Sequence, residues 1–139
     1  MESEVASEVK MSPQIVIEKA MQDILQKGFY DAAHLFSNEG LPLAMAFNSS
    51  GNGERIPTDG DRIAELAILF HDVRRTAMSM GEISSLREVN IEGTNRRKIV
   101  FRFFKAFGQE VILAVVVPPK KSYRKVTNEL EKLILEQSF

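Results

Sequence analysis

Residues 58–81, TDGDRIAELAILFHDVRRTAMSMG, predict a long helix with more apolar surface than a single contact with a core can cover. Thr58 and Asp61 have the spacing of a capping box at its start, and Gly81 is a terminator at its end. At ~100° per residue, the apolar side chains occupy about 260° of the circumference, whereas a core-facing stripe needs little more than ~100°. The remaining apolar sector must be covered by another part of the fold or by a partner.

Two apolar stripes run along this helix. The stripe that suits a sheet consists of Ile63, Leu66, Phe70, Val73 and Ala77. A second, mixed stripe lies about 120° away and consists of Ala64, Ile68, His71, Arg75 and Met78. It has the character of an interface, because small Ala64 and Ala67 permit close approach and Met78 can adapt its shape. We expect a two-fold partner there, the alternative cover being another helix of the same subunit.

The residues before this helix predict a first helix and a β-hairpin. Ser12 as N-cap, Pro13 at the first helical position and Gly28 just past the end delimit the helix. Residues 32–47 form two apolar runs around a turn at Asn38-Glu39-Gly40. The side chains expected to alternate on one face of the hairpin are Leu41, Leu43, Met45 and Phe47. Residues 48–57 are rich in Gly and Ser and predict an exposed loop.

After Gly81 the apolar period changes to that of strands. Residues 84–93 alternate imperfectly, residues 96–104 place Ile99, Phe101 and Phe103 on one face, and residues 110–118 are apolar on both faces. The last of these strands is therefore expected at the centre of the sheet, between the hairpin and the two preceding strands. A third amphipathic helix at 122–137 presents Tyr123, Val126, Leu130, Leu133, Ile134 and Gln137 on one face. The result is an α/β sandwich, with three helices covering a five-stranded antiparallel sheet.

Composition excludes several classes of protein. The length of 139 residues suits one domain, which we place at 13–139 after a flexible tail at 1–12. Without cysteine there is no disulfide, thiol nucleophile or cysteine-ligated metal. The net charge of −1 gives no overall attraction to nucleic acid or acidic membranes. Because no signal peptide or membrane-spanning run is apparent, we expect a cytoplasmic protein without membrane insertion.

No motif points to catalysis. The Gly-containing stretch 51–60 lacks the ending of a phosphate-binding loop. His34 and His71 have no second ligand at metal spacing and are interpreted as structural. Ser49 and Ser50 lie in the predicted loop rather than in the strand-turn-helix setting of a nucleophile. We therefore expect no enzyme activity, cofactor or metal.

The order of elements, the hairpin LFSNEGLPLA at 35–44, the loop after it and the Ala-rich helix ending at Gly81 resemble the roadblock family. This family contains dynein light chains and bacterial regulators of Ras-like small GTPases, and the resemblance covers residues 13–137. It implies a profilin-like sandwich with sheet order 2-1-5-4-3 and element order α-β-β-α-β-β-β-α. It also implies a homodimeric, non-enzymatic adaptor or regulator of a Ras-like small GTPase or a related signalling or motor complex. The long polar loop and the basic NRRK at 95–98 depart from the family pattern.

The resemblance implies dimerisation through the long helix and the third strand. The expected interface consists of Ala64, Ala67, Ile68, His71, Arg75, Met78, Leu86, Val89 and Ile91. If 85–92 is an edge strand, its free backbone groups invite a second copy, and Val89→Pro is expected to remove one donor.

Two other functions remain as alternatives. The basic residues Arg96, Arg97, Lys98, Lys120, Lys121, Arg124 and Lys125 come close together if the fourth and fifth strands are neighbours. With Phe101 or Phe103 they could bind nucleic acid, although strand periodicity favours those rings in the core. A small-molecule sensor of the profilin-like or PAS-like type is the other alternative.

Overall fold

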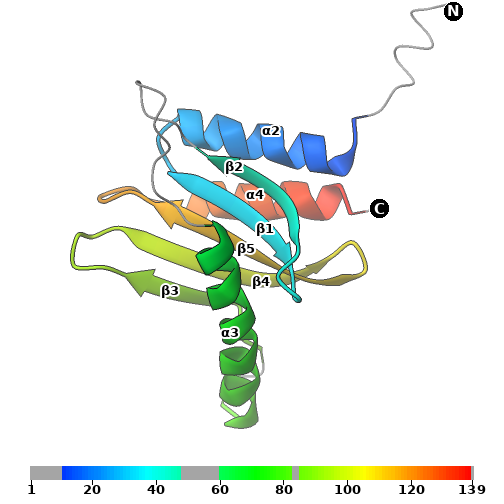
Figure 1. The fold of residues 1–139 in the computed structure, drawn as a ribbon, viewed down its shortest axis with the longest axis vertical. Helices are drawn as coiled ribbons and strands as arrows, with labels where there is room; N and C mark the ends of the chain where they lie inside the picture. Colours follow the sequence, from blue (N-terminus) through cyan, green and yellow to red (C-terminus); the bar gives the residue numbers. More distant parts are fainter. Residues whose placement is uncertain (1–10, 48–59, 83–84, 139) are drawn as a thin grey trace, which may run out of the picture.

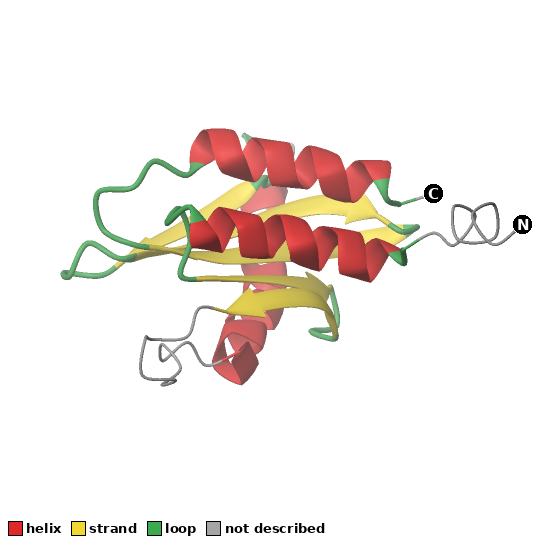
Figure 2. Ribbon diagram, turned by 90° about the horizontal axis from the view of Figure 1, so that it is seen from above, coloured by secondary structure: helices red, strands yellow, loops and turns green. Residues whose placement is uncertain are grey.

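The computed structural model describes residues 11–47, 60–82 and 85–138. In chain order its elements are α2 (Pro13–Gln26), β1 (Ala32–Ser37), β2 (Pro42–Phe47), α3 (Gly60–Ser79), β3 (Glu88–Glu92), β4 (Lys98–Ala106), β5 (Gln109–Val117) and α4 (Arg124–Glu136). The strands form one antiparallel sheet in the order β2-β1-β5-β4-β3. Helices α2 and α4 lie side by side on one face, and α3 crosses the other face alone (Figures 1 and 2). The predicted sandwich, element order and sheet order are confirmed.

Residues at the helix ends explain where the helices begin and stop. The Ser12 hydroxyl accepts a hydrogen bond of 3.3 Å from the Ile15 N–H, which caps the start of α2. Gly28 and Gly81 follow α2 and α3 with φ of +84° and +83°, a left-handed conformation that glycine adopts without strain. Both terminators are confirmed. Thr58 lies outside the described residues, as do the predicted loop at 48–57 and Ser49 and Ser50 within it.

Strand β5 separates two apolar clusters. Val111, Leu113, Val115 and Val117 pack on the side of α2 and α4. Ile112, Ala114 and Val116 pack on the side of α3, together with Phe101, Phe103 and Ile99 of β4. The central, two-sided strand is thus confirmed, and so is the placement of Ile99, Phe101 and Phe103 on one face of β4. Val100 of the same strand is buried on the opposite face. On α4, Leu130 and Ile134 are buried as predicted.

The hairpin departs from its predicted alternation. Leu35 pairs with Ala44 but Phe36 pairs with Pro42, so that Leu43 is an extra residue on β2. Leu43 packs against the α2 side of the sheet and Phe47 against the α3 side, while Leu41 is exposed. An extra residue reverses the alternation of side chains beyond it. Met45 and Phe47 are two residues apart and pair with His34 and Ala32, so these two share a face as expected. The expectation that Leu43 lies on the same face was wrong.

None of the described helices is both long enough and apolar enough to cross a membrane.

Candidate interaction surface

The contact of α3 with the sheet is centred on a small residue. Ala67 is completely buried, Ile63 is buried beside it, and the Phe70 ring meets the Phe101 ring edge-on at 4.8 Å between centroids. These three helix residues are spaced by three or four, so they lie on one line along α3. The short side chain of Ala67 lets the helix approach the sheet closely.

This line is rotated relative to the predicted stripe. Ala67, expected in the dimer interface, instead faces the sheet. Val73, expected against the sheet, is 43% exposed. The next residue, Arg74, forms a salt bridge with Glu110 at the start of β5, with 2.8 Å between the guanidinium nitrogen and the carboxylate oxygen. Both assignments are corrected, because a close approach at Ala67 turns Val73 away from the sheet.

Helix α3 carries an unusual amount of exposed apolar surface. Half of the large apolar side chains exposed among the described residues lie on it or directly after it: Ile68, Leu69, Val73, Met78 and Met80. They occupy two flanks, since Leu69, Val73 and Met80 share one side at helical spacing and Ile68 lies on the other. Such a concentration on a single element makes α3 the candidate interaction surface. Leu69 and Met80 were missing from the predicted interface, although they belonged to the wide apolar arc in the sequence.

The nine predicted interface residues differ in exposure. Those exposed are Ile68, Arg75, Met78 and Ile91, and those partly buried are Ala64, His71, Leu86 and Val89. Arg75 forms an exposed ion pair of 3.6 Å with Asp72 on its own helix. Ala64, Leu86 and Val89 pack in part against the cluster beneath α3. The side chains of Leu86, just before β3, and of Val89 on β3 therefore point to the face of the sheet that α3 covers.

Strand β3 is the last strand of the sheet on its side within the described residues, as predicted. The Phe103 N–H donates to the Arg87 carbonyl at 2.9 Å, so this opposed pair is a hydrogen-bonded one. Along an antiparallel ladder, hydrogen-bonded pairs alternate with pairs that share no hydrogen bond. Val89 is therefore in a hydrogen-bonded pair, and its N–H and carbonyl face β4, whereas those of Asn90 face outward. The expectation that Val89 offers a free edge donor is corrected: the outward groups belong to Glu88, Asn90 and Glu92.

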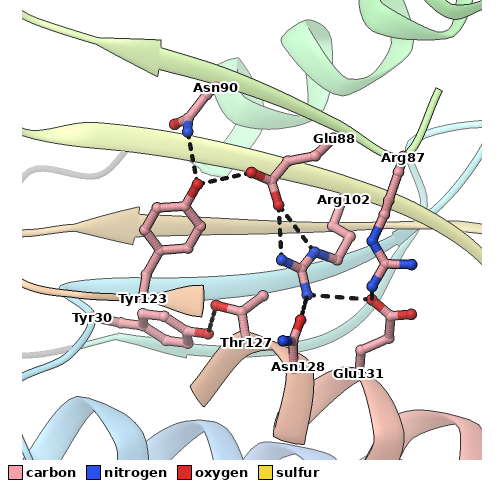
Figure 3. Close-up of polar contacts among 9 residues, drawn as sticks. All are labelled: Tyr30, Arg87, Glu88, Asn90, Arg102, Tyr123, Thr127, Asn128 and Glu131. Carbon is pink, nitrogen blue, oxygen red and sulfur yellow. Dashed lines mark hydrogen bonds and ion pairs between the residues drawn. The ribbon is translucent and has the colours of Figure 1, made fainter. Parts of the chain in front are cut away.

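A charged network anchors this edge strand to α4 (Figure 3). Arg102 on β4 is 3% exposed, and its Nε and Nη2 donate to one carboxylate oxygen of Glu88 at 3.1 and 2.8 Å. Its Nη1 donates to Asn128 of α4 at 2.7 Å and to Glu131 at 3.4 Å. Sequence reasoning missed this buried arginine, because its position on the strand was visible but its partners were not.

Tyr123 completes the network from the start of α4. Its hydroxyl donates to the second oxygen of Glu88 at 2.8 Å and accepts from the Asn90 amide at 2.8 Å. Burial raises the pKa of Glu88, but the hydrogen bonds from Arg102 and Tyr123 outweigh it and hold the pKa below the usual 4.5. Burial and the bond to Glu88 raise the pKa of Tyr123. Glu88 is therefore a fixed anion in the wall of a cleft of about 480 Å³, with Arg87, Arg102, Arg124 and Asn128 around it.

A second polar contact ties the segment between α2 and β1 to α4. The Tyr30 and Thr127 hydroxyls are 2.6 Å apart in the buried core. Burial raises the pKa of Tyr30 to about 12, so the hydroxyl keeps its proton at neutral pH. Thr127 was not predicted to be buried, because a polar residue gives no apolar signal.

The alternatives from the sequence have little support in this geometry. Phe101 and Phe103 are buried, so neither ring can stack on a base as a nucleic-acid site would require. An apolar hollow of about 240 Å³ between α2, β1, β2 and the β4–β5 turn is smaller than a typical ligand pocket of ~300–1,000 Å³. The cleft of about 480 Å³ at Glu88 is large enough, but it is lined by charged and polar side chains instead of the apolar ones typical of such pockets. His34 is buried between Phe36 and Phe47, its ring stacked 5.5 Å from Phe36. The described residues contain no group of three acidic or histidine side chains that could hold a metal.

A sheet in this order, with two helices on one face and a single exposed helix on the other, is the profilin-like arrangement that the roadblock resemblance implied. No family model and no curated protein matches this sequence. Solved structures do match. The gliding protein MglB from Thermus thermophilus is 14% identical, with a TM-score of 0.73 over 94% of this chain and 93% of its own.

Two further solved structures have the same fold. An MglB with a tetrameric arrangement is 14% identical, with a TM-score of 0.70 over 94% of this chain and 96% of its own. A Roadblock/LC7 domain from Streptomyces avermitilis is 18% identical, with a TM-score of 0.62 over 84% of this chain and 90% of its own. At these identities the comparisons establish the fold, which is that of Roadblock/LC7 domains.

Proposed function

We propose that this chain is a non-enzymatic, homodimeric adaptor or regulator that binds a Ras-like small GTPase through α3 and the adjoining edge strand. The observation that carries the proposal is the exposed apolar surface of α3, where Ile68 and Val73 stand 47% and 43% exposed on different flanks. A second copy can cover one flank and leave the other for a different protein. The proposal also places the chain in the roadblock family, whose bacterial members include regulators of Ras-like small GTPases.

Self-association has two sources of support. The exposed apolar side chains of α3 are aliphatic residues and methionine, which suit the core of an interface. Charged side chains of the same helix, among them Asp72 and Arg75, are also exposed and suit its rim. The outward backbone of β3 can pair with a second copy across a two-fold axis and continue the sheet. A tetrameric arrangement is described for an MglB of the same fold.

A regulator of a GTPase must distinguish its nucleotide states. A ligand shifts a two-state equilibrium only as far as its affinities for the two states differ. We therefore expect this chain to bind the GTP form of its partner more tightly than the GDP form, without itself carrying nucleotide or metal.

The test uses a purified Ras-like small GTPase from the same organism as this chain. Calorimetry of the purified GTPase, loaded with GDP or a non-hydrolysable GTP analogue, is expected to show an affinity difference of at least about tenfold. Val73→Asp should weaken binding, because the charge would have to be desolvated at the contact. Leu135→Asp on α4, on the opposite face, is the matched control. Equal affinities would remove the regulatory role, and absence of binding would remove the GTPase as partner.

A further inference from the structure

Basic side chains gather at one end of the sheet. Lys98 pairs with Val117, so the β3–β4 turn lies beside the segment that follows β5. In Figure 1 both connections project from the left of the sheet, and α4 begins just behind them. The residues brought together there, which we call the basic end, are Arg96, Arg97, Lys98, Lys120, Lys121, Arg124 and Lys125. The sequence predicted this proximity on condition that β4 and β5 are neighbours, and they are.

Few acidic groups compensate the basic end. Arg97 pairs with Asp31 at 3.1 Å, and Lys98 reaches Glu92 at 3.8 Å. No salt bridge to Arg96, Lys120, Lys121 or Lys125 occurs within 11–47, 60–82 and 85–138. A chain with a net charge of −1 thus concentrates uncompensated positive charge at one end.

The backbone holds two of these residues in an uncommon conformation. Arg96 and Lys120 have φ of 72° and 65°, the left-handed region in which side chains other than Gly and Asn are strained. One lies in the β3–β4 turn and the other follows Pro118-Pro119 in the connection from β5 to α4. Phe107, in the β4–β5 turn outside the basic end, has a similar φ of 56°, so this conformation is not confined to the basic end.

The chemistry of the basic end limits its partner. None of the large apolar side chains exposed among the described residues lies in 93–98 or 118–125, so an apolar interface core is missing there. The phenylalanines of β4 are buried and cannot stack on bases. Long cationic side chains on two projecting connections suit a flat polyanionic surface, which demands neither a groove nor a shaped pocket.

We propose that the basic end binds the surface of a membrane rich in anionic lipids, by contact of its lysines and arginines with headgroup phosphates and carboxylates. The chain adsorbs without inserting, and α3 contributes no residue to the contact. This inference goes beyond the proposed function and does not depend on it, because lipid and GTPase use different surfaces.

The experiment measures co-sedimentation of the full chain with vesicles of phosphatidylcholine alone or with about one third phosphatidylserine. Binding is expected only to the anionic vesicles and should fall steeply between about 0.05 and about 0.5 M salt, as the Debye length shrinks. Replacing Lys120, Lys121 and Lys125 together by glutamine should weaken binding roughly 100-fold, at about fivefold per charge.

The matched control replaces Lys19, Lys105 and Lys132, which are exposed outside the basic end, by glutamine. Each triple variant removes three positive charges and lowers the net charge from −1 to −4, so only location differs. Circular dichroism should show both variants folded. Equal losses in the two variants, or equal binding to neutral vesicles, would overturn the proposal. Tighter binding to RNA or duplex DNA than to anionic vesicles would overturn it in favour of nucleic acid.

Discussion

The side chain of Ile68 lies directly over Gly40, so that a Cβ placed on Gly40 would stand 2.7 Å from Ile68 Cδ1. Gly40 closes the β1–β2 turn with φ of +86° and donates its N–H to the Ser37 carbonyl at 2.9 Å. The absence of a side chain at the turn therefore decides where Ile68 sits. It also explains why Ile68 is only half exposed on the flank of α3 that we assign to an interface.

Gly40→Ala is expected to destabilise the chain through two separable effects. The left-handed conformation costs an L-residue about 1–2 kcal/mol, and the contact with Ile68 adds to this. Gly81→Ala is the matched control, since Gly81 has φ of +83° but nothing within 4 Å of its added Cβ. Urea unfolding should show the larger loss at Gly40. In an Ile68→Ala background the loss should fall to that of Gly81→Ala, and an unchanged loss would refute the steric coupling.

Ile68→Asp should dissociate the dimer without unfolding the subunit. Full burial of such a side chain contributes ~1.5–3 kcal/mol, and because Ile68 is 47% exposed in the subunit, about half remains for the interface. Counted in both subunits, the loss reaches about 1.5–3 kcal/mol before the desolvation of the aspartates. Light scattering should report a monomer and circular dichroism an unchanged fold. Leu135→Asp, at 38% exposure on α4, should remain dimeric. A monomeric wild type would exclude the proposed dimer.

Proline substitutions on β3 should separate association from folding. Asn90→Pro removes an N–H that points away from β4, so it should weaken a dimer that continues the sheet. Val89→Pro removes an inward ladder bond and should lower the free energy of unfolding instead. Asn90→Ala controls for the lost side-chain bond to Tyr123. If Asn90→Pro and Asn90→Ala associate equally well, the edge of β3 takes no part in the interface.

Arg102→Met should destabilise the fold in a pH-dependent manner. Removing one partner of a buried ion pair costs about 3–5 kcal/mol, because Glu88 loses both guanidinium donors and keeps the hydrogen bond from Tyr123. Since the pKa of Glu88 is lowered in the folded state, its contribution is full above 4.5 and is lost as the pH falls through the lowered pKa.

The difference in unfolding free energy between wild type and Arg102→Met should therefore shrink as the pH falls below about 4.5. Urea unfolding at neutral and acidic pH measures it. Arg87→Met provides a control, because the Arg87 side chain is 65% exposed and should contribute little. A difference independent of pH would show that Glu88 is not the group that Arg102 holds ionised.

The helices and strands and their order could be predicted from local patterns in the chain. Helix ends follow from local backbone preference, as at Ser12 and Gly81, and neighbours in the chain carry that information. The central place of β5 follows from apolar side chains on both of its faces, since only a strand covered on both sides can bury them. These features depend on spacing along the chain, which a single sequence displays.

How these elements meet was set by the packing of the folded chain. The rotation of α3 depends on the close approach at Ala67, and this placed Val73 in solvent. The extra residue Leu43 redirected the hairpin, and the ladder register turned the Val89 backbone inward. Arg102 is buried because Glu88 and its partners on α4 are far away in sequence and close in space. Each of these outcomes depends on contacts between segments that are distant in the sequence. The spacing of apolar residues along the chain does not predict such contacts.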